Sequence, residues 1–394
     1  MTTQLPTPFP PTRLSPADVR LEDLLEVVAE ETRVEDYPHA SRVQQQVLVY
    51  ESAAVRQAAA DPQERAEVAG ELVRALADGP GIVVFTGAFE PDVVDAATEA
   101  FNDLIAQQRA SGAVGGDHFA KPGANDRVWN ALEKLAVAHP ETFVAYYAND
   151  VVALASSAWL GPGYQVTSQI NVVNPGGAGQ TVHRDYHLGF QSDEVAAAYP
   201  LHVHQLSPVL TLQGAVAHVD MPVESGPTLY LPHSQKYLPG YLAWRRPEFA
   251  EHFVDHHIQL PLAKGDAVFF NPALFHAAGS NHSANIKRMA NLLQVSSAFG
   301  RAMETVDRAR VSKAIYPALL AAKRSGMGAA RIANVVAASA EGYSFPTNLD
   351  LDQPVAGLAP TTQAALVAEA LGQEVSVEEL SRRLAAQSAT KASH

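Results

Sequence analysis

Apolar residues at helical spacing characterise the first part of the chain. Ser15–Asp18 is typical of a helix N-cap followed by proline at the first helical position. The apolar residues of 21–28 then continue at the three- and four-residue intervals of a helix. Asp61–Glu64 repeats the start signal, and its helix is expected to end at Gly79–Gly81. We therefore predict a helical N-terminal extension over residues 1–79.

Further helices are expected on both sides of a central β region. Ile82–Phe85 is short, β-branched and bounded by glycines, which predicts a buried strand. Helical patterns follow over residues 92–110 and 141–159. After Gly300 the pattern is helical again, so residues 301–394 are predicted to form a helical segment that acts as a lid or as a dimer interface.

The central region has the pattern of many short strands. The runs are β-branched or aromatic and are separated by proline, glycine, asparagine and serine. They are Gln165–Val173, Val209–Val219, Thr228–Leu231, Ala267–Asn271 and Ala290–Ser297. Short strands with turns between them favour a sandwich or jelly roll over a parallel α/β sheet.

Composition narrows the functional classes. Of 394 residues, 47% are hydrophobic and 18% charged, which suffices for a sizeable core, and the net charge of -14 argues against nucleic acid or an anionic membrane as partner. The chain has no cysteine, which excludes disulfides, thiolate nucleophiles and iron–sulfur clusters. Neither a secretory signal nor a run long enough to span a bilayer is present. We therefore expect a cytoplasmic protein.

Candidate metal ligands begin with His183 and Asp185. On a strand, side chains two residues apart share one face, with Cα atoms roughly 6.6 Å apart, so both could reach one ion. The glycine-rich turn 174–179 precedes them, and His276 follows the expected strand Ala267–Asn271. Two histidines and one carboxylate form a facial triad with three open positions on iron(II). A 2-oxo acid would take two of these positions, and O₂ the third.

Arg288 adds a carboxylate-binding group to this constellation. It opens the apolar run that follows His276, where a lone guanidinium could grip a carboxylate in bidentate fashion. Arg184 lies between two of the ligands and should point away from the metal by strand alternation.

Three stretches together resemble the phytanoyl-CoA dioxygenase family of iron(II)/2-oxoglutarate oxygenases. They are the H-x-D of His183–Asp185, the turn of Glu224–Ser234, and the segment from Gly265 through His276 to Arg288. The resemblance extends over about residues 80–300. It implies a double-stranded β-helix flanked by N- and C-terminal helices, iron(II) on His183, Asp185 and His276, and 2-oxoglutarate held by Arg288.

The resemblance also implies further contacts and a reaction. Cofactor contacts are expected from Thr167, Gln169 and Asn171 on the strand before the H-x-D, and from Lys121. Because related halogenases lack the carboxylate, Asp185 favours oxygenation. We expect hydroxylation of a small organic molecule with release of succinate and CO₂, although desaturation or ring closure would use the same residues. Tyr186, His187, Phe190 and Trp129 are candidate substrate contacts, and the substrate itself stays open.

Other histidines have plainer interpretations. His218–Asp220 is a second H-x-D, but it lacks the glycine-rich approach. His202 and His204 would share a strand face in a packing or substrate-facing role, and His252 and His256 have helical spacing without a zinc-protease motif. Two alternative functions remain: a cupin-like protein that binds a ligand without turnover, and a zinc hydrolase on the same three ligands. Partners are expected to be a small molecule and a second copy of the chain.

Overall fold

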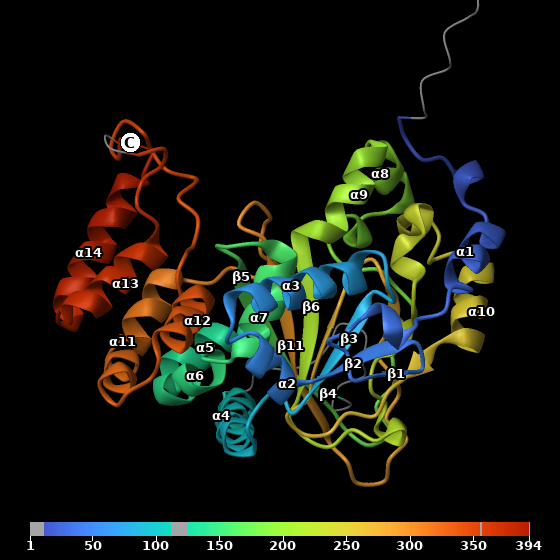
Figure 1. The fold of residues 1–394 in the computed structure, drawn as a ribbon, viewed down its shortest axis with the longest axis horizontal. Helices are drawn as coiled ribbons and strands as arrows, with labels where there is room; N and C mark the ends of the chain where they lie inside the picture. Colours follow the sequence, from blue (N-terminus) through green and yellow to red (C-terminus); the bar gives the residue numbers. More distant parts are fainter. Residues whose placement is uncertain (1–11, 112–124, 355–356, 394) are drawn as a thin grey trace, which may run out of the picture.

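A large sheet, antiparallel except for the parallel pair β2 and β3, organises the protein. The computed structural model describes residues 12–111, 125–354 and 357–393. Eight strands form the sheet in the order β1-β2-β3-β9-β6-β11-β5-β4, and β10-β7-β8 form a smaller sheet (Figure 1). The strands are β1 (Arg42–Gln44), β2 (Val47–Glu51), β3 (Ile82–Thr86), β4 (Asn125–Val128), β5 (Gln165–Val173), β6 (Thr211–Ala217), β7 (Leu229–Leu231), β8 (Ile258–Gln259), β9 (Ala267–Phe270), β10 (Phe275–Ala277) and β11 (Arg288–Ser296).

Two long strands dominate the large sheet. β11 pairs with β5 along its whole length, from Arg288 opposite Val173 to Ser296 opposite Gln165, and with β6 on its other side. Ile170 and Leu293 belong to the main apolar core on one face of the sheet. Alternate residues of the same strands therefore face the smaller sheet, where apolar and polar side chains line a cavity.

The predicted double-stranded β-helix with flanking helices is confirmed. One local expectation was wrong, because the segment with His183 and Asp185 is not a regular strand. It is extended and joined to β10 by a single β-bridge between His183 and His276. Further backbone hydrogen bonds, from Gln180 to Ala278 and from Asp185 to Pro272, hold the segment beside β10 without forming a regular ladder.

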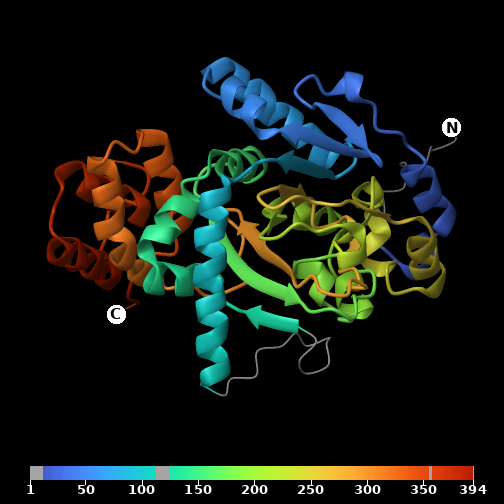
Figure 2. The same ribbon diagram turned by 90° about the horizontal axis from the view of Figure 1, so that it is seen from below.

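Helices surround the sheets at both ends. The α-helices are α1 (Leu21–Val28), α2 (Ser52–Ala58), α3 (Pro62–Ala77), α4 (Pro91–Ala110), α5 (Ala131–Ala138), α6 (Pro140–Tyr147), α7 (Asp150–Leu160), α8 (Asp193–Ala198), α9 (Leu201–Leu206), α10 (Pro247–His256), α11 (Arg308–Arg324), α12 (Ala329–Ser339), α13 (Gln363–Gln373) and α14 (Val377–Thr390). Short 3-10 helices lie at Pro16–Asp18, Val34–Asp36, His187–Phe190, Ser207–Leu210, Val223–Ser225, Ser234–Lys236 and Leu238–Leu242. In both ribbon views, α5 and α6 lie between the large sheet and the C-terminal helices α11–α14 (Figures 1 and 2).

The structure corrects three further expectations. The N-terminal segment is not wholly helical, because β1 and β2 extend the large sheet beside β3. The helical stretch 141–159 is broken into α6 and α7, since the side chain of Asn149 caps α7. His202 and His204 lie on helix α9 rather than on a strand.

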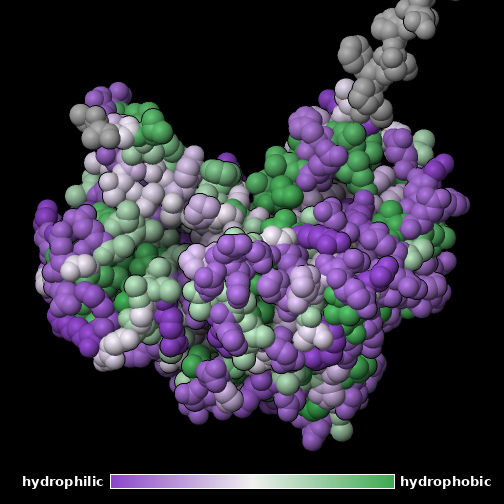
Figure 3. Space-filling view, in the orientation of Figure 1, coloured by the Kyte–Doolittle hydropathy of each residue, from purple (hydrophilic) through white to green (hydrophobic). Residues whose placement is uncertain are grey.

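Polar side chains cover most of the face shown in Figure 3, and apolar ones gather near α8 and α9. Val195, Tyr199 and Leu206 are exposed there.

Among the described residues, no helix is both long and apolar enough to cross a membrane. The domain boundaries at residues 79 and 300 stay a prediction.

Candidate active site

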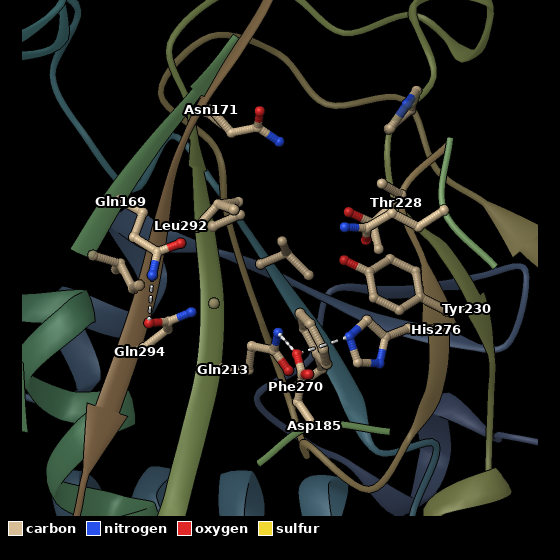
Figure 4. Close-up of a pocket in the computed structure, with 18 of the residues that line it drawn as sticks. Gln169, Asn171, Asp185, Gln213, Thr228, Tyr230, Phe270, His276, Leu292 and Gln294 are labelled. Atoms are coloured by element: carbon tan, nitrogen blue, oxygen red, sulfur yellow. Dashed lines mark hydrogen bonds and ion pairs between the residues drawn. The ribbon is translucent and has the colours of Figure 1, made fainter. Parts of the chain in front are cut away.

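A cavity of about 580 Å³ lies between the two sheets. Its floor consists of side chains from β5, β6, β9 and β11, and its opposite wall comes from β7 and β10 (Figure 4). Polar and ionisable lining residues include Arg127, Gln169, Asn171, His183, Asp185, Gln213, Thr228, Tyr230, His276, Arg288 and Gln294. Much of the remaining lining is aliphatic, including Ala215, Leu260, Val268 and Leu292. The cavity therefore combines a polar group of potential ligands with an apolar interior.

His183, Asp185 and His276 converge at one end of this cavity. Nε2 of His276 lies 3.4 Å from Oδ2 of Asp185, and Nε2 of His183 lies 4.0 Å from the same oxygen. One ligand atom from each of the three residues lies within 4.8 Å of the others, and no other such group of three occurs among the described residues. Two imidazole nitrogens and a carboxylate oxygen at this spacing fit a facial iron(II) site.

Backbone hydrogen bonds position the three ligands. The N–H of His183 donates to the carbonyl of His276 at 2.9 Å, and the N–H of His276 donates back to the carbonyl of His183 at 3.2 Å. The N–H of Asp185 donates to the carbonyl of Pro272 at 3.0 Å. The H-x-D segment is thus attached to β10, which carries the third ligand, and to the loop before it.

Both histidines present the same ring nitrogen to the site. Nδ1 of His183 lies 2.9 Å from the carbonyl oxygen of Thr181, and Nδ1 of His276 lies 2.9 Å from that of Leu274. A carbonyl oxygen can only accept, so Nδ1 carries the proton in each ring. In the neutral form of each ring the lone pair is then on Nε2, which is the atom a metal would bind.

Asp185 is ionised at any physiological pH. Burial raises its pKa, but the hydrogen bond with His276, the nearby charges of His183 and His276 and the hydrogen bond with Gln213 outweigh burial and bring the pKa to about 2. Nε2 of Gln213 donates to Oδ2 of Asp185 at 2.6 Å (Figure 4). The site therefore offers one negatively charged carboxylate and two imidazole nitrogens to a cation.

Arg288 lies in the same cavity as a buried cation. Its side chain is 6% exposed, and burial lowers its pKa to about 10, so it stays charged at neutral pH. Its one hydrogen bond goes to the carbonyl of Gly279 at 3.4 Å, and no carboxylate of the described residues pairs with it. A buried guanidinium without an anionic partner is costly unless a ligand supplies the anion.

The other predicted cofactor contacts divide into three groups. Gln169 and Asn171 line the cavity from β5, and Oδ1 of Asn171 is buried without a partner among the described residues. Thr167 does not line it, because the strand runs past the cavity and its hydroxyl donates to the carbonyl of Gln294 at 2.9 Å. Lys121 lies outside the described residues.

Of the four predicted substrate contacts, two line the cavity and two do not. Trp129 and Phe190 line the cavity, and Phe190 is 55% exposed. Tyr186 and His187 do not line it, so their expected contact with the substrate stays a prediction. Tyr186 is buried with its ring edge-on to Phe190, and Nδ1 of His187 lies 3.4 Å from the hydroxyl of Ser207.

Arg184 points away from the ligands, as strand alternation predicts. It is 2% exposed, donates to the carbonyls of Ser234 and Tyr237, and lies over the rings of Tyr241 and Phe275. Its burial between these groups fixes the backbone between His183 and Asp185.

The other histidines considered as metal ligands, His218, His252 and His256, pack against neighbouring side chains. His218 is buried in the helical side of the core, where its ring lies 2.8 Å from the hydroxyl of Thr98 and 3.0 Å from that of Tyr146. His252 and His256 stack on α10 with ring centroids 4.1 Å apart. None of them belongs to the group of three metal-binding side chains.

Sequence reasoning assigned no cavity role to several polar residues, among them Gln213, Gln294 and Arg127. Gln213 and Gln294 interrupt apolar strands, and that interruption was the available signal. Arg127 lies in a short strand, with its guanidinium over the ring of Trp129 and a hydrogen bond to Oε1 of Gln169. No sequence pattern marked it.

Comparison with solved structures shows distant likeness. One is AviO1 from Streptomyces viridochromogenes Tue57, with 16% identity, TM-score 0.43, and coverage of 59% of this chain and 96% of the other. Another is HygX from Streptomyces hygroscopicus with nickel, 2-oxoglutarate and hygromycin B bound. Its sequence identity is 15% and its TM-score 0.41, and the match covers 58% of this chain and 88% of the other. A third is the carbocyclase SnoK from nogalamycin biosynthesis, with 21% identity, TM-score 0.40, and coverage of 59% and 86%.

The family comparison is more specific. No curated protein matches the chain. The pattern of the family described as Phytanoyl-CoA dioxygenase (PhyH) matches residues 77–289, which is more than half of the chain and includes all three ligand candidates and Arg288. The chain therefore belongs to the phytanoyl-CoA dioxygenase family of iron(II)/2-oxoglutarate-dependent oxygenases.

Proposed function

We propose that this protein hydroxylates a small organic molecule, using iron(II), 2-oxoglutarate and O₂. The observation that carries the proposal is the pairing, in one cavity, of a His-Asp-His group with the buried Arg288, which no carboxylate of the described residues neutralises. A zinc hydrolase on the same triad would not need a buried guanidinium group to bind the carboxylate of a co-substrate.

The triad would hold iron(II) through Nε2 of His183, Nε2 of His276 and a carboxylate oxygen of Asp185. With iron bound, the site would supply oxidation by O₂ coupled to decarboxylation of 2-oxoglutarate to succinate and CO₂. The protein's own part is to keep three coordination positions open and to keep Asp185 ionised. Since Asp185 fills the position that halogenases leave to a halide, oxygen transfer is the favoured outcome.

Arg288 would bind the distal carboxylate of 2-oxoglutarate. Its guanidinium supplies the two parallel donors that match a carboxylate. Thr228 and Tyr230 line the same cavity from β7 and its approach, and Figure 4 shows Tyr230 beside His276. A 2-oxo acid between Arg288 and the triad would thus be held at both ends, which fixes its orientation.

The substrate would enter on the side of Trp129, Phe190 and Met303. All three line the cavity, and Phe190 and Met303 are partly exposed to solvent at 55% and 41%. Apolar side chains at the mouth exclude water from the reacting atoms, while the amides of Gln169 and Gln294 offer hydrogen bonds on the floor. A cavity of about 580 Å³ must hold both 2-oxoglutarate and the reacting part of the substrate, which favours a compact molecule.

Anaerobic loading provides the first test. Protein mixed with iron(II) and 2-oxoglutarate should develop the visible charge-transfer absorption of a chelated 2-oxo acid, and admission of O₂ should release succinate. His183→Ala and Asp185→Ala should abolish both signals, and His256→Ala, which removes an exposed histidine, should leave them unchanged.

The result also separates the alternative functions. A zinc hydrolase would be active with zinc and indifferent to O₂, and a non-catalytic ligand-binding protein would form no succinate with any candidate substrate. Absorption and succinate that persist in both triad variants would contradict the proposed site.

A further inference from the structure

The hydrogen bond from Gln213 to Asp185 reaches a particular oxygen. Nε2 of Gln213, on β6, donates to Oδ2 at 2.6 Å. The same Oδ2 lies 3.4 Å from Nε2 of His276 and 4.0 Å from Nε2 of His183. Gln213 therefore holds the carboxylate oxygen that faces both histidines, and this contact restricts rotation of the carboxylate about its Cβ–Cγ bond.

Stability alone does not account for Gln213. Its Oε1 is buried and has no partner among the described residues. A buried polar atom without a partner costs about 1–3 kcal/mol, which an apolar side chain at this position would avoid. The side-chain hydrogen bond that Gln213 contributes is therefore the one from its Nε2 to Asp185.

The cross-strand neighbour of Gln213 offers a natural comparison. Gln294 lies directly opposite Gln213 in the β6–β11 register and also lines the cavity. Its Oε1 accepts a hydrogen bond from Gln169 at 3.2 Å (Figure 4). Gln294 makes no hydrogen bond with Asp185, so the two glutamines share a place in the sheet and differ in their contact with the triad.

We propose that Gln213 is a positioning residue that holds Asp185 as a single-oxygen metal ligand. The proposal rests on the proposed function. A carboxylate that can rotate binds a cation through one oxygen or through both, and the second mode takes a coordination position. With Asp185 held by Gln213, three positions stay open for 2-oxoglutarate and O₂. Groups that orient a ligand in this way typically change metal affinity 10- to 100-fold when removed.

Metal binding tests the proposal without any substrate. Co(II) is titrated into the full chain in the absence of 2-oxoglutarate, and the visible Co(II) spectrum reports its coordination. Gln213→Met removes both amide atoms at similar length, and we expect it to weaken Co(II) binding by about tenfold or more and to change the spectrum. Gln294→Met is the matched control, with affinity expected to stay within about twofold.

A second reading uses the iron(II) protein without O₂. Gln213→Met should also weaken the binding of 2-oxoglutarate, followed by its charge-transfer absorption. Unchanged Co(II) affinity and spectrum in Gln213→Met would overturn the proposal, and so would an equal loss in both variants. If wild-type protein binds Co(II) but gives no absorption with iron(II) and 2-oxoglutarate, the proposed function fails while the Co(II) comparison still tests Gln213.

Folding of the variants is checked by thermal unfolding without metal. Gln213→Leu is the second substitution if Gln213→Met does not fold. Failure of both to fold, with Gln294→Met folded, would show that Gln213 is needed for structure and would also overturn the proposal.

Discussion

His183 and His276 are joined by a β-bridge although they lie far apart in the sequence. Their backbones exchange two hydrogen bonds, and their ring centroids lie 4.4 Å apart. Because the bridge fixes both backbones, it also fixes where the two Nε2 atoms can lie. The metal-binding geometry therefore depends on this bridge and on the tautomers set by Thr181 and Leu274.

Metal binding should stabilise the fold. A cation that binds only the folded state adds about 2.7 kcal/mol to the free energy of unfolding at a concentration one hundred times its Kd. We expect Co(II) or iron(II) to raise the unfolding temperature of the wild-type protein. Asp185→Ala should show no such rise, and His256→Ala should show the full one. A rise in Asp185→Ala equal to that of the wild type would place the metal elsewhere.

Arg288→Met should weaken binding of 2-oxoglutarate. Charged hydrogen bonds contribute about 1.5–3 kcal/mol each, so the loss should be at least about tenfold to hundredfold in Kd or KM. Co(II) affinity, measured without 2-oxoglutarate, should be unchanged because Arg288 does not contact the triad. Lys287→Met, beside it but exposed, is the control. Normal 2-oxoglutarate affinity in Arg288→Met would remove Arg288 from the cofactor site.

His218 should make the stability of the protein fall in mild acid. Burial lowers its pKa to about 3, whereas an unfolded histidine titrates near 6.5. Below pH 6.5 the unfolded chain takes up a proton that the folded chain refuses, so this contribution is complete above pH 6.5 and is lost as pH falls toward 3. Between pH 7.5 and 5.5 the loss should be about 1.4 kcal/mol.

Urea unfolding of the metal-free protein at both pH values measures this loss. His218→Gln keeps a polar side chain beside Thr98 and Tyr146 but cannot take up the proton. We expect its stability to change less with pH than that of the wild type, by about 1.4 kcal/mol. An identical pH dependence in the two proteins would contradict the role given to His218.

Gly240→Ala should destabilise the segment that carries the H-x-D. A Cβ atom at Gly240 would overlap the guanidinium group of Arg184, which is itself enclosed by Tyr241 and Phe275. Overpacking of this kind costs about 1–3 kcal/mol of unfolding free energy. Gly70→Ala is the control, because Gly70 lies within α3 with open space around it and alanine favours a helix. Equal stability of Gly240→Ala and wild type would show that Arg184 can move aside.

The strands of the core were largely predictable from the sequence. The run Gln165–Val173 coincides with β5, and β11 begins two residues before its predicted start at Ala290. Both are long, β-branched and bounded by turns, so local preference and tertiary packing agree. The prediction that His202 and His204 share a strand was wrong. Two residues at a spacing of two cannot distinguish a strand from a short helix whose other residues pack against the core.

Sequence reasoning was less successful with contacts at the cavity. Thr167 lies on the same face of β5 as Gln169 and Asn171. The alternation of side chains along a strand predicts this face, but it does not predict where along the strand the cavity ends. Gln213 and Arg127 were missed because their partners come from other strands or loops, and no local pattern encodes such partners.

The sequence by itself determined the identities of the candidate ligands, the family and the order of the strands along the chain, because short motifs and residue periodicity are local properties. Tertiary structure alone decided which oxygen of Asp185 faces the histidines, that Gln213 holds it, and that Arg288 is buried without a carboxylate partner among the described residues. These are distances between segments remote in sequence, set by sheet register and by backbone bridges such as that between His183 and His276.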